Sequence, residues 1–350
     1  MEFFNKRIAS TNLSGYYLMR NGEFTYNKSY STAYPWGAVK RLDRYEKGVV
    51  SNLYIVFEAH NIDSDFLVTY FDTNRWYKEV AIRAKEGARN HGLLNISADD
   101  FLSSSFTIPL SISEQEKIGS LFKELSFQIS SQIECCEKLH KLKSALLTSL
   151  FPQGKDIHPR IRLNGFVGDW TEMKASDIFQ PVSDKGHPEL TILSASQELG
   201  MIPRSKNGID MSYGTQNVAS YKKVSPGQFV IHLRSFQGGF AHSAIEGITS
   251  PAYTIMRLKD EERQDDLFWK FILVSSDFIK RLESVTYGIR DGKSIKFEDF
   301  ANLKFYVPQK AEQKAIADLL TEYDRLIRLN EQKLEKLRNL KQAMLDKMFV

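Results

Sequence analysis

The stretch GIRDGKS at residues 288–294 is the part of this sequence closest to a nucleotide-binding loop. A phosphate-binding loop of the form GxxxxGK[ST] has four residues between its glycines, because its backbone N–H groups must surround the phosphates. Only three residues separate Gly288 from Gly292, and the corresponding stretch GARNHGLLNIS at residues 87–97 has no lysine at that place. We therefore predict no ATP site in this chain.

Other residue types that carry out enzyme chemistry are present without the spacing that the chemistry needs. A DNA adenine methyltransferase carries an Asn/Asp-Pro-Pro-aromatic motif, and no two prolines are adjacent here. The seven histidines form no HExxH pattern or paired spacing for a metal ion. Cys135 and Cys136 lie within a helical pattern, where small buried side chains are more common than redox groups. The sequence thus predicts no catalytic residue, no metal and no cofactor bound by this chain.

The composition is typical of a folded protein with two domains. The chain has 350 residues, 42% of them hydrophobic, and domains commonly span about 100–200 residues. Its formal net charge of +4 is a weak indication of an anionic partner. The first residues, MEFFNKRIAS, lack the pattern of a signal peptide, and the apolar runs are too short to cross a membrane. We expect a cytoplasmic protein, because two adjacent cysteines cannot form a disulfide framework.

An internal repeat organises the chain. EKLHKLKSALLTSLF at residues 137–151 and EKLRNLKQAMLDKMF at residues 335–349 are identical at eight of fifteen positions. Upstream, GVVSNLY at residues 48–54 resembles GITSPAY at residues 247–253. Further matching pairs are 21–28 with 226–233, 106–109 with 305–308, and 114–115 with 312–313. One structural unit is therefore predicted to be present twice.

Each copy ends in a helix with an apolar seam that recurs every 3.5 residues, which is typical of helices that wind around each other. In the first copy the seam consists of Ile118, Phe122, Leu125, Ile129, Gln132, Cys136, Leu139, Lys143, Leu146 and Leu150. In the second copy it consists of Ile316, Leu320, Tyr323, Ile327, Asn330, Leu334, Leu337, Lys341, Met344 and Met348. Our candidates for helix pairing and partner docking are Ile118, Phe122, Leu125, Ile129, Leu139, Leu146, Ile316, Leu320, Tyr323, Ile327, Leu334, Leu337 and Met344. The polar members can fix the register or face a third helix.

The first long helix follows Pro109 and is predicted over residues 114–151, a length of about 57 Å at 1.5 Å per residue. Ser113 and Glu116 have the spacing of a capping box at its start. Two interpretations are open: the two long helices pair into a rigid spacer, or each one closes its own domain at the surface. The seam in both copies favours pairing.

The segments between the helices are typical of mixed domains with short strands. After a polar linker at residues 152–163, we predict a domain from Gly165 to Pro308. Its predicted strands are 190–195, 228–233 and 253–258, followed by a helix near 266–283. The first copy follows the same order from Tyr16, with residues 66–77 in the place of that helix.

These features together resemble the specificity (S, HsdS) subunits of type I restriction-modification enzymes. NGFVGDW at residues 164–170 is similar to the start of a target-recognition domain of that family. LRSFQGGFAHSAIEGITSPAY at residues 233–253 is similar to the core of such a domain. A proline, then Glu-Gln and isoleucine, then the helix end LKxAxLxxxF resembles the family's conserved-region signature, and both copies contain it. The resemblance extends over essentially the whole chain.

The resemblance implies an α+β fold with a pseudo-twofold internal repeat. Two mixed α/β target-recognition domains would be separated by two long conserved helices that pair as an antiparallel coiled coil. The implied segments are recognition domain 1 at 1–109, spacer helix 1 at 110–151, a linker at 152–164, recognition domain 2 at 165–308 and spacer helix 2 at 309–350. The first domain has only 23 residues before Phe24, whereas 64 residues run from Gly165 to Gln228 before the equivalent Phe229. We therefore expect its N-terminal part to be truncated.

The resemblance also implies a function and a set of partners. The chain would be a non-catalytic subunit that binds a bipartite site in double-stranded DNA and directs adenine methylation and cleavage. Its partners would be two methylation (M) subunits and the restriction (R) subunits, which would bind S-adenosylmethionine and ATP, with no membrane contact. The alternative is a silent variant that acts only as a coiled-coil scaffold without recognising DNA.

DNA recognition directs attention to basic and amide side chains, which contact phosphates and base edges. The first candidates lie in two glycine-containing loops ahead of the long helices: Arg290, Lys293 and Lys296, and Arg83, Lys85 and Arg89. Further candidates are Arg234, Gln237, Gln216, Asn217, Arg204 and Lys206 in the second domain, and Lys28, Lys40 and Arg41 in the first. The open alternative for a loop arginine is an internal pair with a carboxylate such as Asp291 or Glu298.

Overall fold

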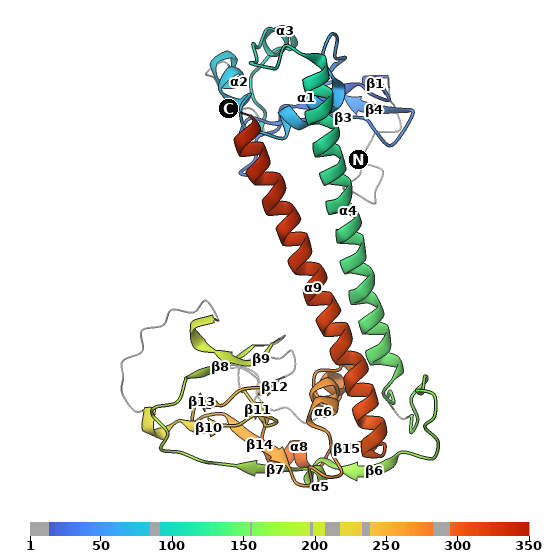
Figure 1. The fold of residues 1–350 in the computed structure, drawn as a ribbon, viewed down its shortest axis with the longest axis vertical. Coiled ribbons are helices and arrows are strands. Elements are labelled where there is room, and N and C mark those ends of the chain that lie inside the picture. Colours follow the sequence, from blue (N-terminus) through green and yellow to red (C-terminus); the bar gives the residue numbers. More distant parts are fainter. Residues whose placement is uncertain are drawn as a thin grey trace. The chain divides into compact units, whose positions relative to one another are not determined.

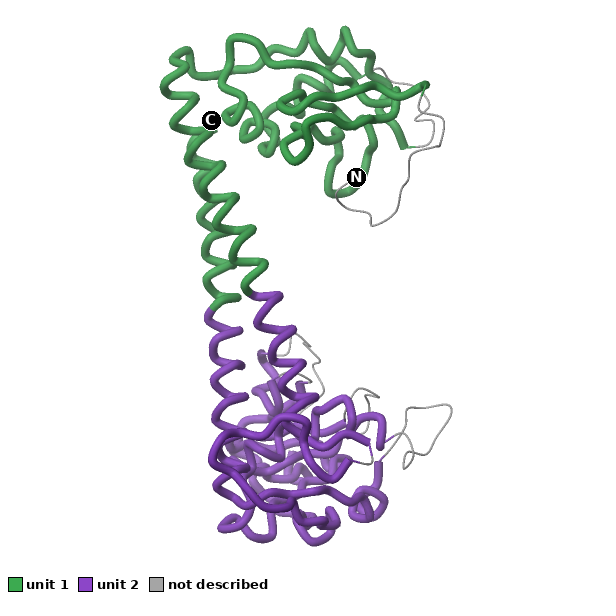
Figure 2. Tube along the Cα trace, turned by 90° about the vertical axis from the view of Figure 1, so that its right-hand side faces the viewer, with its two compact units in different colours: residues 1–135, 330–350 green, residues 136–329 purple. Residues whose placement is uncertain are grey.

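The computed structural model describes residues 14–84, 92–154, 156–196, 199–206, 218–232, 239–282 and 295–349. The chain forms two compact units, shown in green and purple in Figure 2. The first unit comprises residues 1–135 and 330–350, and the second unit comprises residues 136–329. Two long helices, α4 (Ile112–Ser149) and α9 (Lys310–Met348), each contribute one part to each unit (Figure 1).

The described residues of the first unit form two small antiparallel sheets and three short helices. β1 (Tyr16–Arg20) pairs with β4 (Lys47–Ser51), and β2 (Phe24–Asn27) lies between β3 (Ala38–Arg41) and β5 (Ile55–Phe57). The helices are α1 (Ser64–Phe71), α2 (Tyr77–Arg83) and α3 (Ala98–Leu102). Alternate residues of β2, Phe24 and Tyr26, are buried in the core, as expected for a strand with one covered face.

The second unit has a four-stranded antiparallel sheet of order β12-β11-β14-β7. Its strands are β7 (Phe179–Val182), β11 (Phe229–Ile231), β12 (Phe240–His242) and β14 (Thr254–Leu258). Three strand pairs accompany it: β6 (Thr171–Lys174) with β15 (Lys304–Val307), β8 (Leu193–Ser196) with β9 (Gly200–Pro203), and β10 (Lys222–Val224) with β13 (Gly247–Thr249). The helical elements are α5 (Ala175–Ile178), η2 (Arg204–Lys206), η3 (Val218–Ser220), α6 (Asp266–Ile272), α7 (Ser276–Leu282) and α8 (Phe297–Ala301).

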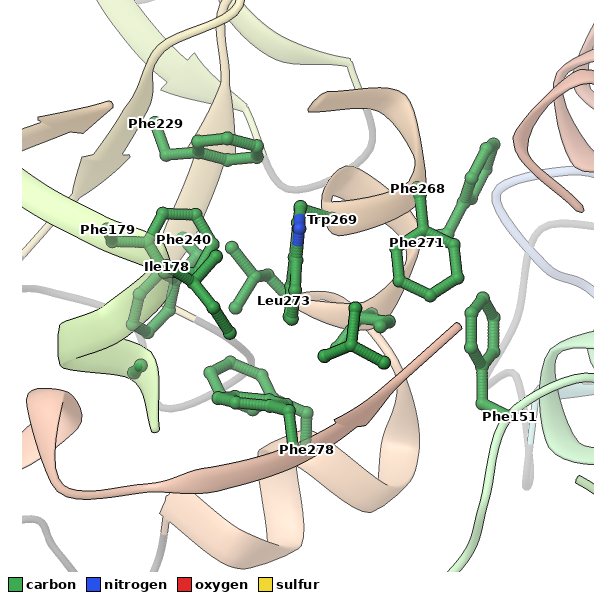
Figure 3. Close-up of a cluster of buried hydrophobic side chains, with 14 of the residues drawn as sticks. Phe151, Ile178, Phe179, Phe229, Phe240, Phe268, Trp269, Phe271, Leu273 and Phe278 are labelled. Atoms are coloured by element: carbon green, nitrogen blue, oxygen red, sulfur yellow. The ribbon is translucent and has the colours of Figure 1, made fainter. Parts of the chain in front are cut away.

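Aromatic side chains dominate the main core of the second unit (Figure 3). Trp269 of α6 meets Phe179 edge-on, with ring centroids 5.1 Å apart, and Phe305 at 5.2 Å. The Trp269 indole N–H donates to Gln264 Oε1 at 3.0 Å, so the polar group of this buried ring is paired. The opposite face of β11 carries Val230, which belongs to a second, smaller cluster.

The strand pairing of the first unit recurs in the second. Phe24 of β2 lies opposite Phe57 of β5, and in the same way Phe229 of β11 lies opposite Met256 of β14. The pair β1–β4 corresponds to β10–β13. Together with the two long helices, this duplication confirms the predicted α+β repeat. Among the described residues of the first unit no strand corresponds to β7, and the expected truncation of the first domain stays a prediction.

Three predicted boundaries differ from the structure. The helix predicted near 266–283 is two helices, because Ser275 Oγ accepts the Phe278 N–H and starts a new helix, α7, after α6. The capping box predicted at Ser113 is wrong, because α4 begins at Ile112 and the Oγ of Ser111 accepts the Glu114 N–H. The strand predicted at 190–195 is found as β8, three residues later at its start.

In each unit a side-chain hydrogen bond connects the sheet to the first turn of the following helix. Arg41 of β3 donates to Asp65 of α1 at 2.6 Å, and His242 of β12 lies 2.7 Å from Asp266 of α6. Burial raises the pKa of Asp65, but hydrogen bonds from Lys123 and Arg41 outweigh it and hold that pKa below its ordinary value. The hydrogen bond with His242 likewise lowers the pKa of Asp266. Carboxylates in a first helical turn are also stabilised by the helix dipole.

The C-terminal end of each long helix packs in the core beside the start of the other long helix. In the first unit Phe349, just after α9, contacts the rings of Phe66 at 5.6 Å and Phe122 at 6.0 Å. In the second unit Phe151, just after α4, contacts Phe268 at 5.5 Å. Within each unit the helix parts therefore run antiparallel, and the predicted antiparallel pair is confirmed.

We expect Phe349→Ala and Phe151→Ala each to lower the free energy of unfolding by about 3 kcal/mol, because removal of a buried ring leaves a cavity. Denaturant unfolding followed by circular dichroism measures this loss. Phe127→Ala is the matched control, since Phe127 on α4 is 68% exposed and its removal should cost less than about 0.5 kcal/mol. Equal losses in all three variants would contradict the anchoring role of the two buried rings.

We expect Asp65→Asn to lower the free energy of unfolding at pH 7 by about 1 kcal/mol, a figure reduced for partial exposure. Since the pKa of Asp65 is lowered in the folded chain, its stabilisation is present above the ordinary aspartate pKa of about 3.9 and is lost as the pH falls through the lowered pKa. Thermal unfolding from pH 7 downward should show the two proteins converging. A difference that persisted unchanged at the acid end would contradict this assignment.

Candidate nucleic-acid interface and helix pair

Eight of the predicted DNA-contacting residues lie outside the described residues, and their roles stay predictions. They are Lys85, Arg89, Gln216, Asn217, Arg234, Gln237, Arg290 and Lys293. The sequence places them in four connections: after α2, after η2, between β11 and β12, and between α7 and α8.

Two described candidates lie beside these connections. Lys206 is exposed at the end of η2, next to residues 207–217, and Lys296 is exposed as the N-cap residue of α8, next to residues 283–294. Arg204, at the start of η2, is half-buried. An exposed lysine at the base of a loop can contact a phosphate without losing a core contact.

Two predicted arginines are engaged inside the first unit. Arg83 donates to Glu79 Oε2 at 2.6 Å and to the Ser103 carbonyl at 3.0 Å, which connects α2 to the end of α3. The side chain of Arg41 is 12% exposed and is held by the ion pair with Asp65. The internal bonds occupy most of the N–H groups of each guanidinium and leave few for a phosphate. Pairing with a carboxylate, the alternative raised for the loop arginines, is what the structure shows for these two.

The two predicted lysines of the first unit also have internal partners. Lys28 Nζ donates to the Ile96 carbonyl at 3.3 Å, and Lys40 Nζ lies 2.8 Å from Asp72 Oδ1. Lys40 remains largely exposed, so a phosphate could compete for its ammonium group.

A half-buried lysine on β10 was not predicted. Lys222 Nζ donates to the Tyr253 carbonyl at 2.6 Å, and Lys185 forms an isolated bridge to Lys222. Burial, and then the charge of Lys185, lower the pKa of Lys222. The next residue of the strand, Lys223, lies 3.0 Å from Glu246 Oε2, so a carboxylate offsets part of the positive charge here. The sequence signal was the basic pair in YKK at residues 221–223, which resembles an ordinary solvated strand edge.

The polar groups of the cavity in the second unit serve internal contacts. This cavity of about 290 Å³ is lined by residues that include Asp277, Arg281 and Lys304. Asp277 Oδ1 accepts the Gly154 N–H at 2.9 Å, and Arg281 donates to the Lys304 carbonyl. These bonds connect the linker and β15 to α7. Among the described residues no group of three His, Cys, Asp or Glu side chains could hold a metal ion.

The polar contacts between the long helices occur at equivalent positions of the repeat, and α4 and α9 exchange roles between the two units. In the first unit Gln132 Nε2 donates to Asn330 Oδ1 at 2.7 Å, and these two are equivalent positions of the repeat. Lys341 Nζ donates to Ser126 Oγ at 3.0 Å in the first unit. In the second unit the equivalent lysine, Lys143, pairs with Asp324. Polar seam residues therefore bond to the facing helix.

The predicted seam is the least exposed side of both helices. The buried seam residues are Ile118, Phe122, Leu125, Gln132, Cys136, Leu150, Ile316, Leu320 and Ile327. Those half-buried are Ile129, Leu139, Lys143, Leu146, Tyr323, Asn330, Leu334, Leu337, Lys341 and Met344. Met348 is the exception, because it is exposed and Leu345 is buried in its place.

One pair of equivalent leucines lies away from the seam. Leu142 on α4 is 46% exposed and Leu340 on α9 is 49% exposed. A large apolar side chain at the same exposed place in both copies marks a candidate partner contact outside the predicted seam. In the described part of the chain, no helix is long and apolar enough to span a membrane.

Comparison with known proteins gives one consistent family. The model of the type I restriction modification DNA specificity domain matches residues 168–339. The type I restriction enzyme MjaVIII specificity subunit of Methanocaldococcus jannaschii is 22% identical over 317 residues, which cover 86% of this chain and 73% of that protein.

Two solved structures share the fold. The type I restriction-modification S subunit from M. genitalium superimposes with a TM-score of 0.54 and 16% identity, covering 95% of this chain and 83% of that chain. A structure described as the basis of complex assembly and conformational transition of the type I R-M system gives 0.51 and 16%, covering 97% and 84%. The family match, the curated relative and the shared fold agree with the motifs and the repeat. Residues 168–339 thus match the type I restriction modification DNA specificity domain, and the chain as a whole is similar to type I restriction-modification specificity (HsdS) subunits.

Proposed function

We propose that this chain is the DNA-binding specificity subunit of a type I restriction-modification complex. Its two units would each recognise one half of a bipartite site in double-stranded DNA, and its paired helices would dock two M subunits, with R subunits joining them. The observation that carries the proposal is the double repeat: the same strand register and the same long helix occur twice. Two similar modules suit two half-sites, and two equivalent helix faces suit two copies of one partner.

The exposed lysines Lys206 and Lys296 support this role, because they flank two of the four connections that carry predicted DNA-contacting residues. Arg41 and Arg83 are left out of the proposed interface, since internal carboxylates hold them. The chain would contribute binding and positioning but no chemistry. S-adenosylmethionine and ATP would bind in the partner subunits, and the complex would work in the cytoplasm.

A second candidate function is a silent variant that only assembles the complex. The first unit favours it, because its two described arginine candidates are engaged internally and its described residues contain no counterpart of β7. The two functions differ in DNA binding and agree in partner binding. Two separate measurements are therefore needed.

For the first, the dissociation constant of duplex DNA should rise steeply with salt when this chain is assembled with its M subunit, because phosphate contacts release counterions. Lys206→Gln and Lys296→Gln should each reduce the logarithmic salt slope by about 1. Fluorescence anisotropy at several salt concentrations measures both effects, with exposed Lys336→Gln on α9 as the control. If the dissociation constant of the assembled complex did not change with salt concentration, the silent variant would be supported instead.

For the second, Leu142→Glu and Leu340→Glu should weaken recruitment of the M subunit by about tenfold or more, because each places a charge at an apolar contact. Leu139→Glu and Leu337→Glu, on the seam, should weaken recruitment and also lower the melting temperature. Co-purification and thermal unfolding separate the two classes, with exposed Asn339→Glu as the control. Normal recruitment by all four variants would rule out docking on the paired helices.

A further inference from the structure

In the first unit one buried glutamine of α4 connects three parts of the chain. Gln115 is 2% exposed, and its Oε1 accepts the Asp63 N–H at 2.8 Å while its Nε2 donates to the Pro109 carbonyl at 2.7 Å. Asp63 precedes α1, and Pro109 precedes α4. A planar amide that is bonded at both ends cannot rotate without losing a hydrogen bond.

The bond to Asp63 replaces one that α1 cannot make for itself. Asp63 is the N-cap of α1, and its carboxylate accepts the Phe66 N–H at 2.7 Å. In a capping box, a Glu or Gln at the place of Phe66 would return a bond to the N-cap N–H. Phe66 is instead buried against Phe349, so Gln115 of another helix supplies the acceptor.

The second unit repeats this arrangement. Gln313 is 1% exposed, its Oε1 accepts the Asp265 N–H at 2.9 Å, and its Nε2 donates to the carbonyls of Pro308 at 2.9 Å and Arg263 at 3.1 Å. Asp265 is the N-cap of α6 and accepts the Phe268 N–H at 2.9 Å. The same amide therefore performs the same connection in both halves of the repeat.

We propose that Gln115 and Gln313 are positioning residues that fix the orientation of each recognition domain on its long helix, and so set the spacing between half-sites that the complex accepts. The link to spacing rests on the proposed function. The helices that the amides hold, α1 and α6, are themselves bound to the sheets by the side-chain contacts of Asp65 and Asp266. A rotation at these helix starts would therefore displace the sheets and the loops that leave them.

The backbone of α4 also approaches α1 closely at this point. A Cβ added at Gly119, one turn after Gln115, would lie 2.5 Å from the Phe66 backbone nitrogen and 2.7 Å from Asp63 Oδ1. Gly119→Ala should therefore move α1 away from α4 with Gln115 itself unchanged. This second variant perturbs the same orientation by a different physical cause.

The first measurement tests the orientation without DNA. In the full chain assembled with the M subunit, one spin label would be placed on exposed Cys135 of α4 and one on Asn52→Cys in the turn before β5, with Cys136→Ala in every protein. Pulsed electron spin resonance should show a broader or shifted distance distribution in Gln115→Met and Gly119→Ala. Gln128→Met is the matched control, because Gln128 is exposed and bonds only to Glu124 within α4. Distributions identical to wild type in both variants would overturn the positioning role.

The second measurement tests the spacing. Methylated adenines mapped in cells give the wild-type target, and purified complexes are then assayed for methylation of duplexes in which the distance between the half-sites varies. In Gln115→Met and Gln313→Met, the preference for the best spacing over its neighbours should fall about five- to tenfold, the size expected for a lost buried hydrogen bond. Activity at the best spacing should stay within about twofold of wild type, as in the controls Gln128→Met and Gln342→Met.

The outcomes separate the inference from the proposed function. An equal loss of methylation at every spacing would show a merely structural role and overturn the inference. Unchanged spacing preference in proteins with altered distance distributions would overturn the link between orientation and spacing. If the assembled wild-type complex methylated nothing, the proposed function would fail, and the distance distributions would still decide whether the two glutamines hold the domains.

Discussion

The burial of one helix end in the core of the other half is the contact on which the architecture depends. Phe349 completes the first core and Phe151 completes the second, and each comes from a helix that begins in the opposite unit. A buried aromatic ring removes a large apolar area from water, so these two contacts contribute strongly to stability. Each core therefore lacks one of its aromatic rings unless the two helices pair antiparallel.

The N-termini of α1 and α6 gather most of the remaining constraints. At each one an aspartate caps the helix, and a second carboxylate in the first turn bonds to a basic side chain of the sheet. A glutamine of a long helix then accepts the backbone N–H of the cap residue. These bonds satisfy helix N–H groups that have no partner within the helix. Sheet, short helix and long helix therefore meet at one small polar junction in a largely aromatic core.

The helical part of this fold follows from the sequence and the polar junctions do not. A seam of period 3.5 predicted two paired helices, because periodicity alone selects the side of a helix that is buried. Periodicity also explains why one helix was wrongly predicted near 266–283, because the apolar face continues from α6 into α7 across the break at Ser275. Arg41 resembled a surface charge, because its partner Asp65 lies 24 residues away in sequence. Gln115 aligns with Gln313 in the repeat, but it bonds to backbone atoms. Such bonds cannot be predicted from residue types, because every residue type has a backbone carbonyl.

The division of the chain also sets an order in which its parts can fold during synthesis. The second unit is one continuous stretch, residues 136–329, so the ribosome delivers all of it before any of residues 330–350. The first unit is made first but lacks the α9 end that packs against Phe66 and Phe122 until Phe349 emerges. Domains made early usually fold early. Here the earlier domain cannot complete its aromatic core until the last residues of the chain have been made.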